Sequence, residues 1–210
     1  LPWAIEIDDA INPNAPILHD FIKFDGQPSN IAGTLEHKKG DIEKGFKEAD
    51  VVIERNFDTS AIHQGYLETH ACLVSVSPDN KTVIWSSSQG QFMVRAMTSF
   101  ITGIPQSDIR AIPAEIGGGF GGKTIVYLEP VATILSKKSG RPVKMVMTRE
   151  EVMRATGPTS ASKSTVKIGA TKDGKITAAK GVFYLQAGAF PGSPIRGAAG
   201  CCLAPYDIPN

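Results

Sequence analysis

The feature that most constrains the fold is a run of five glycines in the six positions 117–122, interrupted by Phe120. Such a run cannot lie inside a helix or a strand, because glycine loses more backbone entropy on ordering than any other residue. It can adopt left-handed conformations and turn successive N–H groups toward the oxygens of a ligand. The alternative is a flexible surface loop, but the large apolar ring of Phe120 argues against it. The sequence therefore predicts a ligand-binding loop.

Alternating apolar residues predict two β-hairpins. The first covers residues 71–86 with its turn at 78–80, and the second covers 162–185 with its turn at Asp173-Gly174. Further strands are predicted at 51–57, 108–112 and 143–147, the last of them buried. With helices between the strands, the sequence predicts an α+β fold of mixed sheets with hairpins and flanking helices.

Helices are predicted from apolar residues at helical spacing and from capping signals. A helix over 91–102 places Phe92, Ala96 and Phe100 on one face. Another helix follows the glycine run, and Pro130 either kinks it or marks its start. The capping residues predicted from the sequence are Asp41, Thr148 in a capping box with Glu151, and the helix-ending Gly103 and Gly140.

Composition bounds the kinds of partner. The 22 basic and 21 acidic residues give a net charge of +1, so there is no electrostatic case for nucleic acid or for an acidic membrane surface. No apolar run approaches the ~20 residues that cross a bilayer. Three scattered cysteines argue against a disulfide framework and favour a reducing compartment, for which we expect the cytoplasm. The ends of the chain suggest a fragment of a longer protein.

Residues 117–124 also satisfy the phosphate-binding P-loop pattern GxxxxGK[ST], between a predicted strand and a predicted helix. A P-loop enzyme needs an acidic residue at a strand end to hold Mg²⁺, but the strand over 143–147 is followed by Thr148 and Arg149. The fold of such enzymes is mainly parallel, whereas this chain predicts hairpins. A P-loop nucleotide-binding protein stays an alternative, as does a non-catalytic structural domain.

Four segments occur together and in a fixed order: 64–70 (QGYLETH), 86–91 (SSSQGQ), the glycine run with Lys123, and 140–151. In this combination the chain resembles the molybdopterin-binding subunit of the xanthine dehydrogenase and aldehyde oxidase family of molybdenum hydroxylases. The resemblance assigns residues 38–210 to the N-terminal part of the molybdopterin-binding domain. Residues 1–37 resemble the tail of a preceding hammerhead-like α/β domain, or a linker.

The resemblance also implies site residues. Gln89 stands where the family has a glutamine that donates a hydrogen bond to an oxygen ligand of molybdenum, although Gln89 could instead cap the following helix. The backbone of Gly118, Gly119, Phe120 and Gly121 matches the segment that wraps the molybdenum end of the cofactor. No residue is expected to bind the metal directly. Lys123 is expected in a salt bridge or a cap, and Glu68 and His70 are expected as a buried, hydrogen-bonded structural pair.

The resemblance implies what lies outside the chain and which substrate the complete enzyme takes. The family's general base is a glutamate far downstream, so no catalytic residue is expected here, and the fragment is expected to be inactive alone. Iron–sulfur clusters and possibly FAD belong to other domains or subunits, and an oligomer is expected. Purine-oxidising members carry a glutamate directly after the lysine, where this chain has Thr124. Thr124 is therefore a candidate substrate-pocket residue, and the expected substrate is an aldehyde or an aromatic heterocycle hydroxylated with water.

Overall fold

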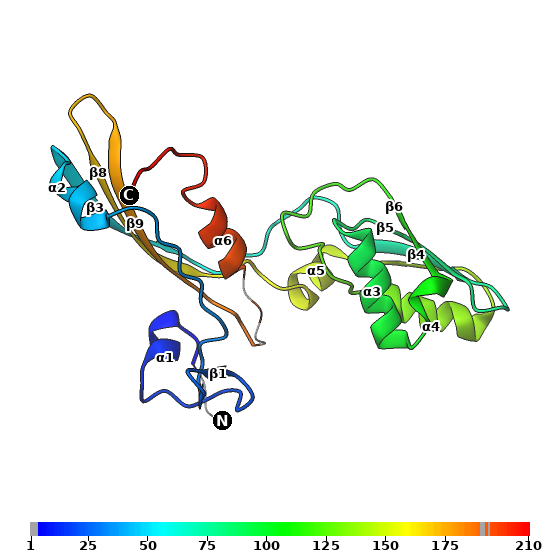
Figure 1. Ribbon diagram of the computed structural model, residues 1–210. Helices are drawn as coiled ribbons and strands as arrows, with labels where there is room; N and C mark the ends of the chain where they lie inside the picture. Colours follow the sequence, from blue (N-terminus) through cyan, green and yellow to red (C-terminus); the bar gives the residue numbers. More distant parts are fainter. Residues whose placement is uncertain (1–3, 190–191, 193) are drawn as a thin grey trace. The chain divides into compact units, whose positions relative to one another are not determined.

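The computed structural model describes residues 4–189, 192 and 194–210. The chain forms two compact units (Figure 1). The central unit is Ile62–Thr159, and the flanking unit combines Leu1–Ala61 with Ser160–Asn210. The chain thus leaves the flanking unit, builds the central unit and returns, an organisation that the sequence analysis did not predict.

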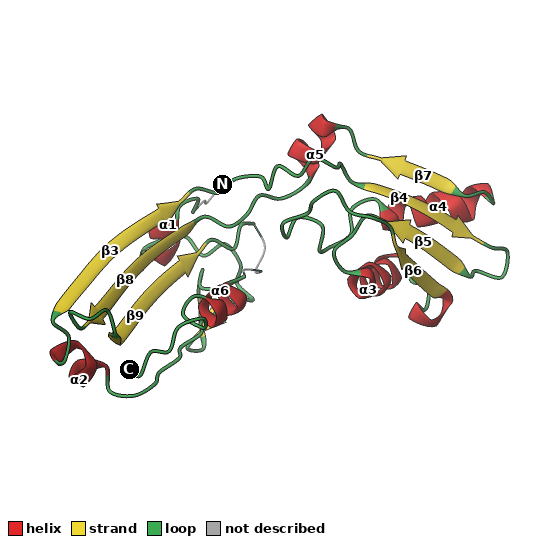
Figure 2. Ribbon diagram, turned by 90° about the horizontal axis from the view of Figure 1, so that it is seen from above, coloured by secondary structure: helices red, strands yellow, loops and turns green. Residues whose placement is uncertain are grey.

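The central unit is built on a four-stranded sheet in the order β6-β5-β4-β7 (Figure 2). Strands β4 (Ala71–Val76) and β5 (Thr82–Ser86) form the predicted antiparallel hairpin. Strand β6 (Ile109–Pro113) pairs parallel to β5, after the crossover helix α3 (Gln91–Thr102) and the 3₁₀ helix at Gln106–Asp108. The α+β prediction of mixed sheets with hairpins is confirmed, and the central sheet contains one parallel pair beside its hairpin.

One face of this sheet carries the core of the central unit. Alternate residues Cys72, Val74 and Ile84 are buried there against Val94 of α3 and Ala132 of α4 (Glu129–Ser139). Because side chains alternate along a strand, this packing gives β4 and β5 their alternating burial. Helix α4 begins at Glu129 and has Pro130 in its first turn, so Pro130 marks the start of the helix and not a kink.

The prediction of a buried strand over 143–147 is wrong, and the helical spacing over 91–102 did not show which face of that helix packs on the core. The stripe of Phe92 and Phe100 on α3 faces away from the core, with 87% and 84% of each residue exposed, while Val94 and Thr98 face inward. Strand β7 (Val143–Val146) was predicted to be buried, but it is an edge strand and Val146 is 53% exposed. The sequence identified both elements, but it did not show which of their side chains pack on the core.

The flanking unit has a three-stranded antiparallel sheet in the order β3-β8-β9. Its strands are β3 (Val51–Thr59), β8 (Ser162–Ala170) and β9 (Ile176–Leu185), and β8 and β9 form the predicted hairpin around Gly174. Helix α2 (Ile42–Lys47) begins at the predicted cap Asp41, whose side chain accepts the Lys44 N–H. The remaining elements are α1 (Ile7–Ile11), β1 (Lys23–Phe24), β2 (Gln27–Pro28) and α6 (Ile195–Cys201).

Candidate functional site

The glycine run forms a loop on the central unit, between β6 and α4. Its backbone has positive φ at Gly118 (+95°), Phe120 (+48°) and Gly121 (+90°). A positive φ costs a non-glycine residue roughly 1–2 kcal/mol, so the conformation at Phe120 is strained. Such strain persists only where surrounding contacts fix the backbone, and it is often found at ligand sites.

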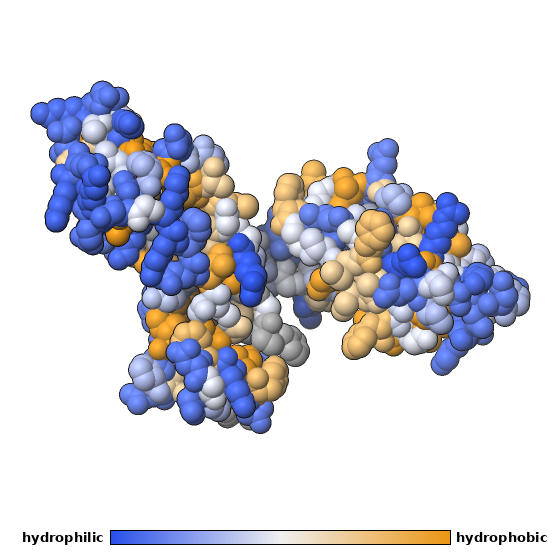
Figure 3. All heavy atoms as spheres, viewed as in Figure 1, coloured by the Kyte–Doolittle hydropathy of each residue, from blue (hydrophilic) through white to orange (hydrophobic). Residues whose placement is uncertain are grey.

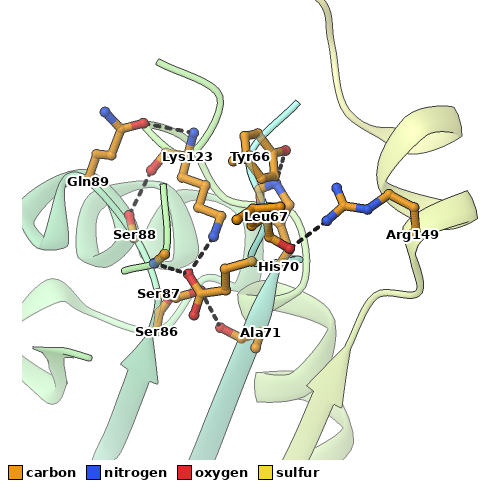
Figure 4. Close-up of polar contacts among 12 residues, drawn as sticks. Tyr66, Leu67, His70, Ala71, Ser86, Ser87, Ser88, Gln89, Lys123 and Arg149 are labelled. Carbon is orange, nitrogen blue, oxygen red and sulfur yellow. Dashed lines mark hydrogen bonds and ion pairs between the residues drawn. The ribbon is translucent and has the colours of Figure 1, made fainter. Parts of the chain in front are cut away.

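The side chain of Gln89 fixes one side of this loop. Its Oε1 accepts the N–H of Gly121 at 3.0 Å and that of Lys123 at 3.1 Å. Only the oxygen of a carboxamide can accept two such bonds, so the NH₂ group must point away from the loop (Figure 4). This NH₂ group donates to no described residue. Helix α3 is capped by Gly90 without a side-chain bond, so the alternative that Gln89 caps this helix is wrong.

The approach of Gln89 to the loop requires a glycine opposite it. A Cβ on Gly119 would lie 2.4 Å from Gln89 Oε1, which is closer than atoms can pack. The neighbouring backbone is tied in as well, since Gln89 N–H and the Ser88 hydroxyl both donate to the Lys123 carbonyl, at 2.9 and 3.0 Å. The glycine content of the loop is therefore partly a packing requirement within the protein.

Glu68 fixes the other side of the loop. Its Oε2 accepts the Gly117 N–H at 2.8 Å and the Lys123 ammonium at 2.6 Å. Lys123 is buried, with 1% of its side chain exposed, so the predicted salt bridge is confirmed. Partial burial alone would raise the pKa of Glu68, but the bonds from Lys123 and Gly117 prevail and lower it, which keeps the carboxylate ionised at neutral pH.

Glu68 and His70 do not pair with each other, so that prediction is wrong. His70 is buried, and its Nε2 lies 2.7 Å from the Tyr66 hydroxyl. The same hydroxyl is 3.3 Å from Thr156 Oγ1, which also contacts His63 Nε2 at 2.7 Å. Burial lowers the pKa of His70, helped by the nearby charge of Lys123, so its imidazole is neutral. This network ties His70 and Tyr66 to His63 and Thr156.

The loop does not bind nucleotide phosphates in the manner of a P-loop. There the lysine reaches the phosphates and the helix begins at the Gly-Lys-Thr residues. Here the Lys123 ammonium is buried against Glu68, and α4 begins only at Glu129. The P-loop alternative is therefore wrong.

The remaining donors of the loop suit an oxygen-rich ligand. Within the described part of the chain, the N–H groups of Gly118, Gly119 and Phe120 donate no hydrogen bond. A Cβ on Gly121 would meet nothing within 4 Å, so there is open space at this point of the loop. Phe120 is 72% exposed, so its ring does not count against a surface loop in the way the sequence suggested. Together with the NH₂ of Gln89, these uncharged donors fit the oxo and anionic oxygens of a molybdopterin cofactor.

The sequence analysis placed Thr124 in a substrate pocket, and the structure places it at the exposed end of the loop. Its hydroxyl donates to the Gly121 carbonyl at 3.0 Å. The analysis did not foresee that Arg149 donates to the Leu67 carbonyl at 2.6 Å, which holds the segment that presents Glu68 (Figure 4). Nor did it single out Tyr66, which is buried against the loop. Only the order of the motifs hinted at these contacts.

Comparison with known proteins shows the family to which the chain belongs. Residues 23–210 match the model of the molybdopterin cofactor-binding domain. The chain is 32% identical to the probable hypoxanthine oxidase XdhD of Escherichia coli over 89% of its length, and 31% identical to the carbon monoxide dehydrogenase large chain of Hydrogenophaga pseudoflava over all of it. A solved carbon monoxide dehydrogenase from Oligotropha carboxidovorans superposes on the whole chain with a TM-score of 0.67 at 29% identity.

The chain spans only 22% of the length of the first of these relatives and 28% of the other two. The family match nevertheless covers most of the chain, and it agrees with the resemblance seen in the four sequence segments. The chain belongs to the molybdopterin cofactor-binding domain family of molybdenum hydroxylase large subunits.

Proposed function

We propose that this chain forms one wall of the cofactor site of a molybdenum hydroxylase. The observation that carries the proposal is the locked carboxamide of Gln89, whose oxygen is held by two N–H groups of the loop while its NH₂ is left to donate. Gln89 donates to an acceptor on the cofactor, and the N–H groups of Gly118, Gly119 and Phe120, which bond to no described residue, supply further donors from the same loop. When bound, the cofactor supplies the two-electron redox chemistry of a hydroxylation in which oxygen comes from water.

The chain itself contributes a hydrogen-bond donor that is held in a fixed orientation and carries no charge. A carboxamide adds a donor but no charge, and its rotation is blocked by the two bonds to its oxygen. Donors that are fixed before the reaction stabilise developing charge without a cost of reorganisation. The catalytic base and the other cofactor contacts are expected from the rest of the subunit, and the chain alone is expected to be inactive.

The substrate that we propose for the complete enzyme is an aldehyde or an aromatic heterocycle other than xanthine. Support comes from Thr124, which is uncharged and whose hydroxyl is already engaged by Gly121. The names of the relatives do not select a substrate, since they range from hypoxanthine to carbon monoxide. We also propose iron–sulfur and flavin partners for electron transfer, a division at residues 37–38 from a preceding domain, and a cytoplasmic location.

Metal analysis and kinetics of the complete subunit test the proposal. We expect stoichiometric molybdenum in the purified protein. Gln89→Ala should retain the metal and reduce kcat by roughly 10²-fold, as is typical for losing one fixed donor at a developing charge. Gln89→Glu still accepts both loop N–H groups but lacks the NH₂ donor, so it should lose a similar factor while keeping the loop in place.

Two results would count against the proposal. A purified complete subunit without molybdenum would favour the non-catalytic structural domain. A Gln89→Ala variant that unfolds at lower temperature but has an unchanged kcat would limit Gln89 to holding the loop.

A further inference from the structure

The loop that carries the free donors is closed by a single carboxylate oxygen. Glu68 Oε2 binds the backbone N–H of Gly117 and the ammonium of Lys123, so it joins the two ends of the loop at 2.8 and 2.6 Å. The backbone adds a third tie, from Glu68 N–H to the Gly117 carbonyl at 3.1 Å. The distance between the ends of the loop therefore depends on Glu68.

Lys123 connects Glu68 to Gln89. Its ammonium is bound by Glu68 and lies 5.0 Å from the centroid of the Tyr66 ring. Its N–H is bound by Gln89 Oε1, and its carbonyl accepts the Gln89 N–H. The ammonium bound by Glu68 and the backbone groups that orient the Gln89 carboxamide belong to the same residue (Figure 4). A shift of the Lys123 side chain would therefore move these backbone groups.

A buried lysine needs a reason to be there. Burying an ammonium destabilises a fold unless a well-placed anion compensates, and apolar residues of similar volume often stabilise a fold as well or better. Lys123 is 1% exposed, and its anion, Glu68, is anchored by Gly117 and by the segment that Arg149 holds. The ion pair differs from an apolar contact because it fixes the relative position of its groups. Charge-assisted hydrogen bonds constrain geometry more tightly than apolar packing does.

We infer that Glu68 is a positioning residue, which sets the orientation of the Gln89 carboxamide through its ion pair with Lys123. Glu68 touches neither substrate nor cofactor in this role. The inference rests on the proposed function, because the orientation of Gln89 matters only if Gln89 donates to the cofactor.

A double-mutant cycle in the complete subunit tests this coupling. The pair is removed by Glu68→Gln with Lys123→Met, which leaves no unpaired buried charge, and is combined with Gln89→Ala. The readouts are the molybdenum content, kcat per molybdenum with an aromatic aldehyde, nicotinate and xanthine, and the electron paramagnetic resonance signal of dithionite-reduced molybdenum. The matched control is Asp108→Asn, which breaks the ion pair of Lys81 and Asp108 in the same unit, away from the loop.

We expect the neutral pair to retain molybdenum, to lower kcat roughly tenfold and to shift the resonance signal, while Asp108→Asn changes neither. In the Gln89→Ala background the neutral pair should lower kcat less than about twofold further, because the group that it positions is gone. The inference would be overturned if the factors by which the neutral pair and Gln89→Ala each lower kcat multiplied in the combined variant. It would also be overturned if the neutral pair left kcat and the resonance signal unchanged.

Two further arrangements keep the test decisive. If the neutral pair does not accumulate, Glu68→Asp takes its place in the cycle, because it keeps the charge but withdraws the carboxylate by one methylene. A wild-type subunit without molybdenum would overturn the proposed function itself. A wild-type subunit with molybdenum and multiplying losses would overturn only the role of Glu68.

Discussion

The two sheets of this chain bury their side chains differently. In the central unit, β4 and β5 alternate between buried and exposed residues, and their buried side chains share one core with α3 and α4. In the flanking unit every residue of β3 is exposed, and an open groove runs along the apolar side chains of β3 and β8. The loop with the candidate site is therefore attached to the unit that has a core of its own, as expected where donors must be held in place.

Exposed apolar residues qualify this contrast. Apolar surface gathers over α3 of the central unit (Figure 3), where Phe92 and Phe100 are exposed. Both units thus leave apolar faces uncovered within the described residues, but only the central unit also has a closed core. The following predictions test whether substitutions in the two units differ in their effects on turnover and on the free energy of unfolding.

The largest difference is expected between two glycines with nearly the same φ angle. Gly121 in the loop has φ +90° and Gly174 in the β8–β9 turn has φ +87°, and a Cβ on either would meet nothing within 4 Å. Valine at either position should cost similar backbone strain. In the complete enzyme, Gly121→Val should abolish turnover, by roughly 10³-fold or more, because its side chain would fill the space proposed for the cofactor, whereas Gly174→Val should leave kcat unchanged. Comparable activity of the two variants would contradict the proposal that the loop lines the cofactor site.

A core truncation should separate the units by stability. Ile84 is fully buried, so Ile84→Ala should cost about 2–5 kcal/mol of unfolding free energy. Ile53 on β3 is 52% exposed, and Ile53→Ala should cost less than about 1 kcal/mol. Urea unfolding of this chain, followed by hydrogen exchange in each unit, measures both. Equal costs would mean that the exposed sheet face is covered by something that the described residues do not include.

Sequence reasoning predicted the elements whose signals are local. The capping box of Thr148 and Glu151 forms as predicted, and Gly103 and Gly140 end their helices in the left-handed conformation. Each of these signals involves residues a few positions apart, and their geometry depends little on the rest of the chain. Periodicity placed α3 correctly and put Phe92 and Phe100 on one face, but it could not show that the core packs on the opposite face, which carries Val94 and Thr98.

The site was predicted in part, and the missing part is non-local. The glycine loop and Gln89 were identified from motif order, but nothing in the sequence shows that Gln89 holds the loop through its oxygen. The pairing of Glu68 with Lys123, 55 positions away, also depends on the fold that brings the two segments together. Alternation along an extended segment places Glu68 and His70 on one face. The hydrogen-bond partners that the fold brings to Glu68 nevertheless decide where its carboxylate points.

A smaller difference is expected in the response to acid. Burial lowers the pKa of His70 in the folded central unit below its ordinary value of 6.5. The unfolded chain then binds the proton more readily, so stability that is present at neutral pH is lost as the pH falls below about 6.5. Glu68, with its pKa below 4.5, adds a second loss in the same direction at lower pH. His70→Gln should flatten the pH dependence between 7 and 5, and His37→Gln, at an exposed position of the flanking unit, should not. An unchanged slope in His70→Gln would show that another group carries it.

The smallest expected effect concerns substrate choice, at the exposed end of the loop. Thr124 donates to the Gly121 carbonyl, so replacing it removes one loop bond, worth about 0.5–1.5 kcal/mol. Thr124→Glu also adds the carboxylate that purine-oxidising members of the family carry after the lysine. Because polar contacts in a pocket discriminate strongly between substrates, the ratio of kcat/KM for xanthine to that for an aromatic aldehyde should rise about tenfold.

Thr124→Gln has the same length without the charge and loses the same loop bond, so it separates the effect of the carboxylate from the effect of the lost loop bond. If both variants changed the ratio equally, Thr124 would act on the loop and not on the substrate, and the argument against xanthine would lose its support.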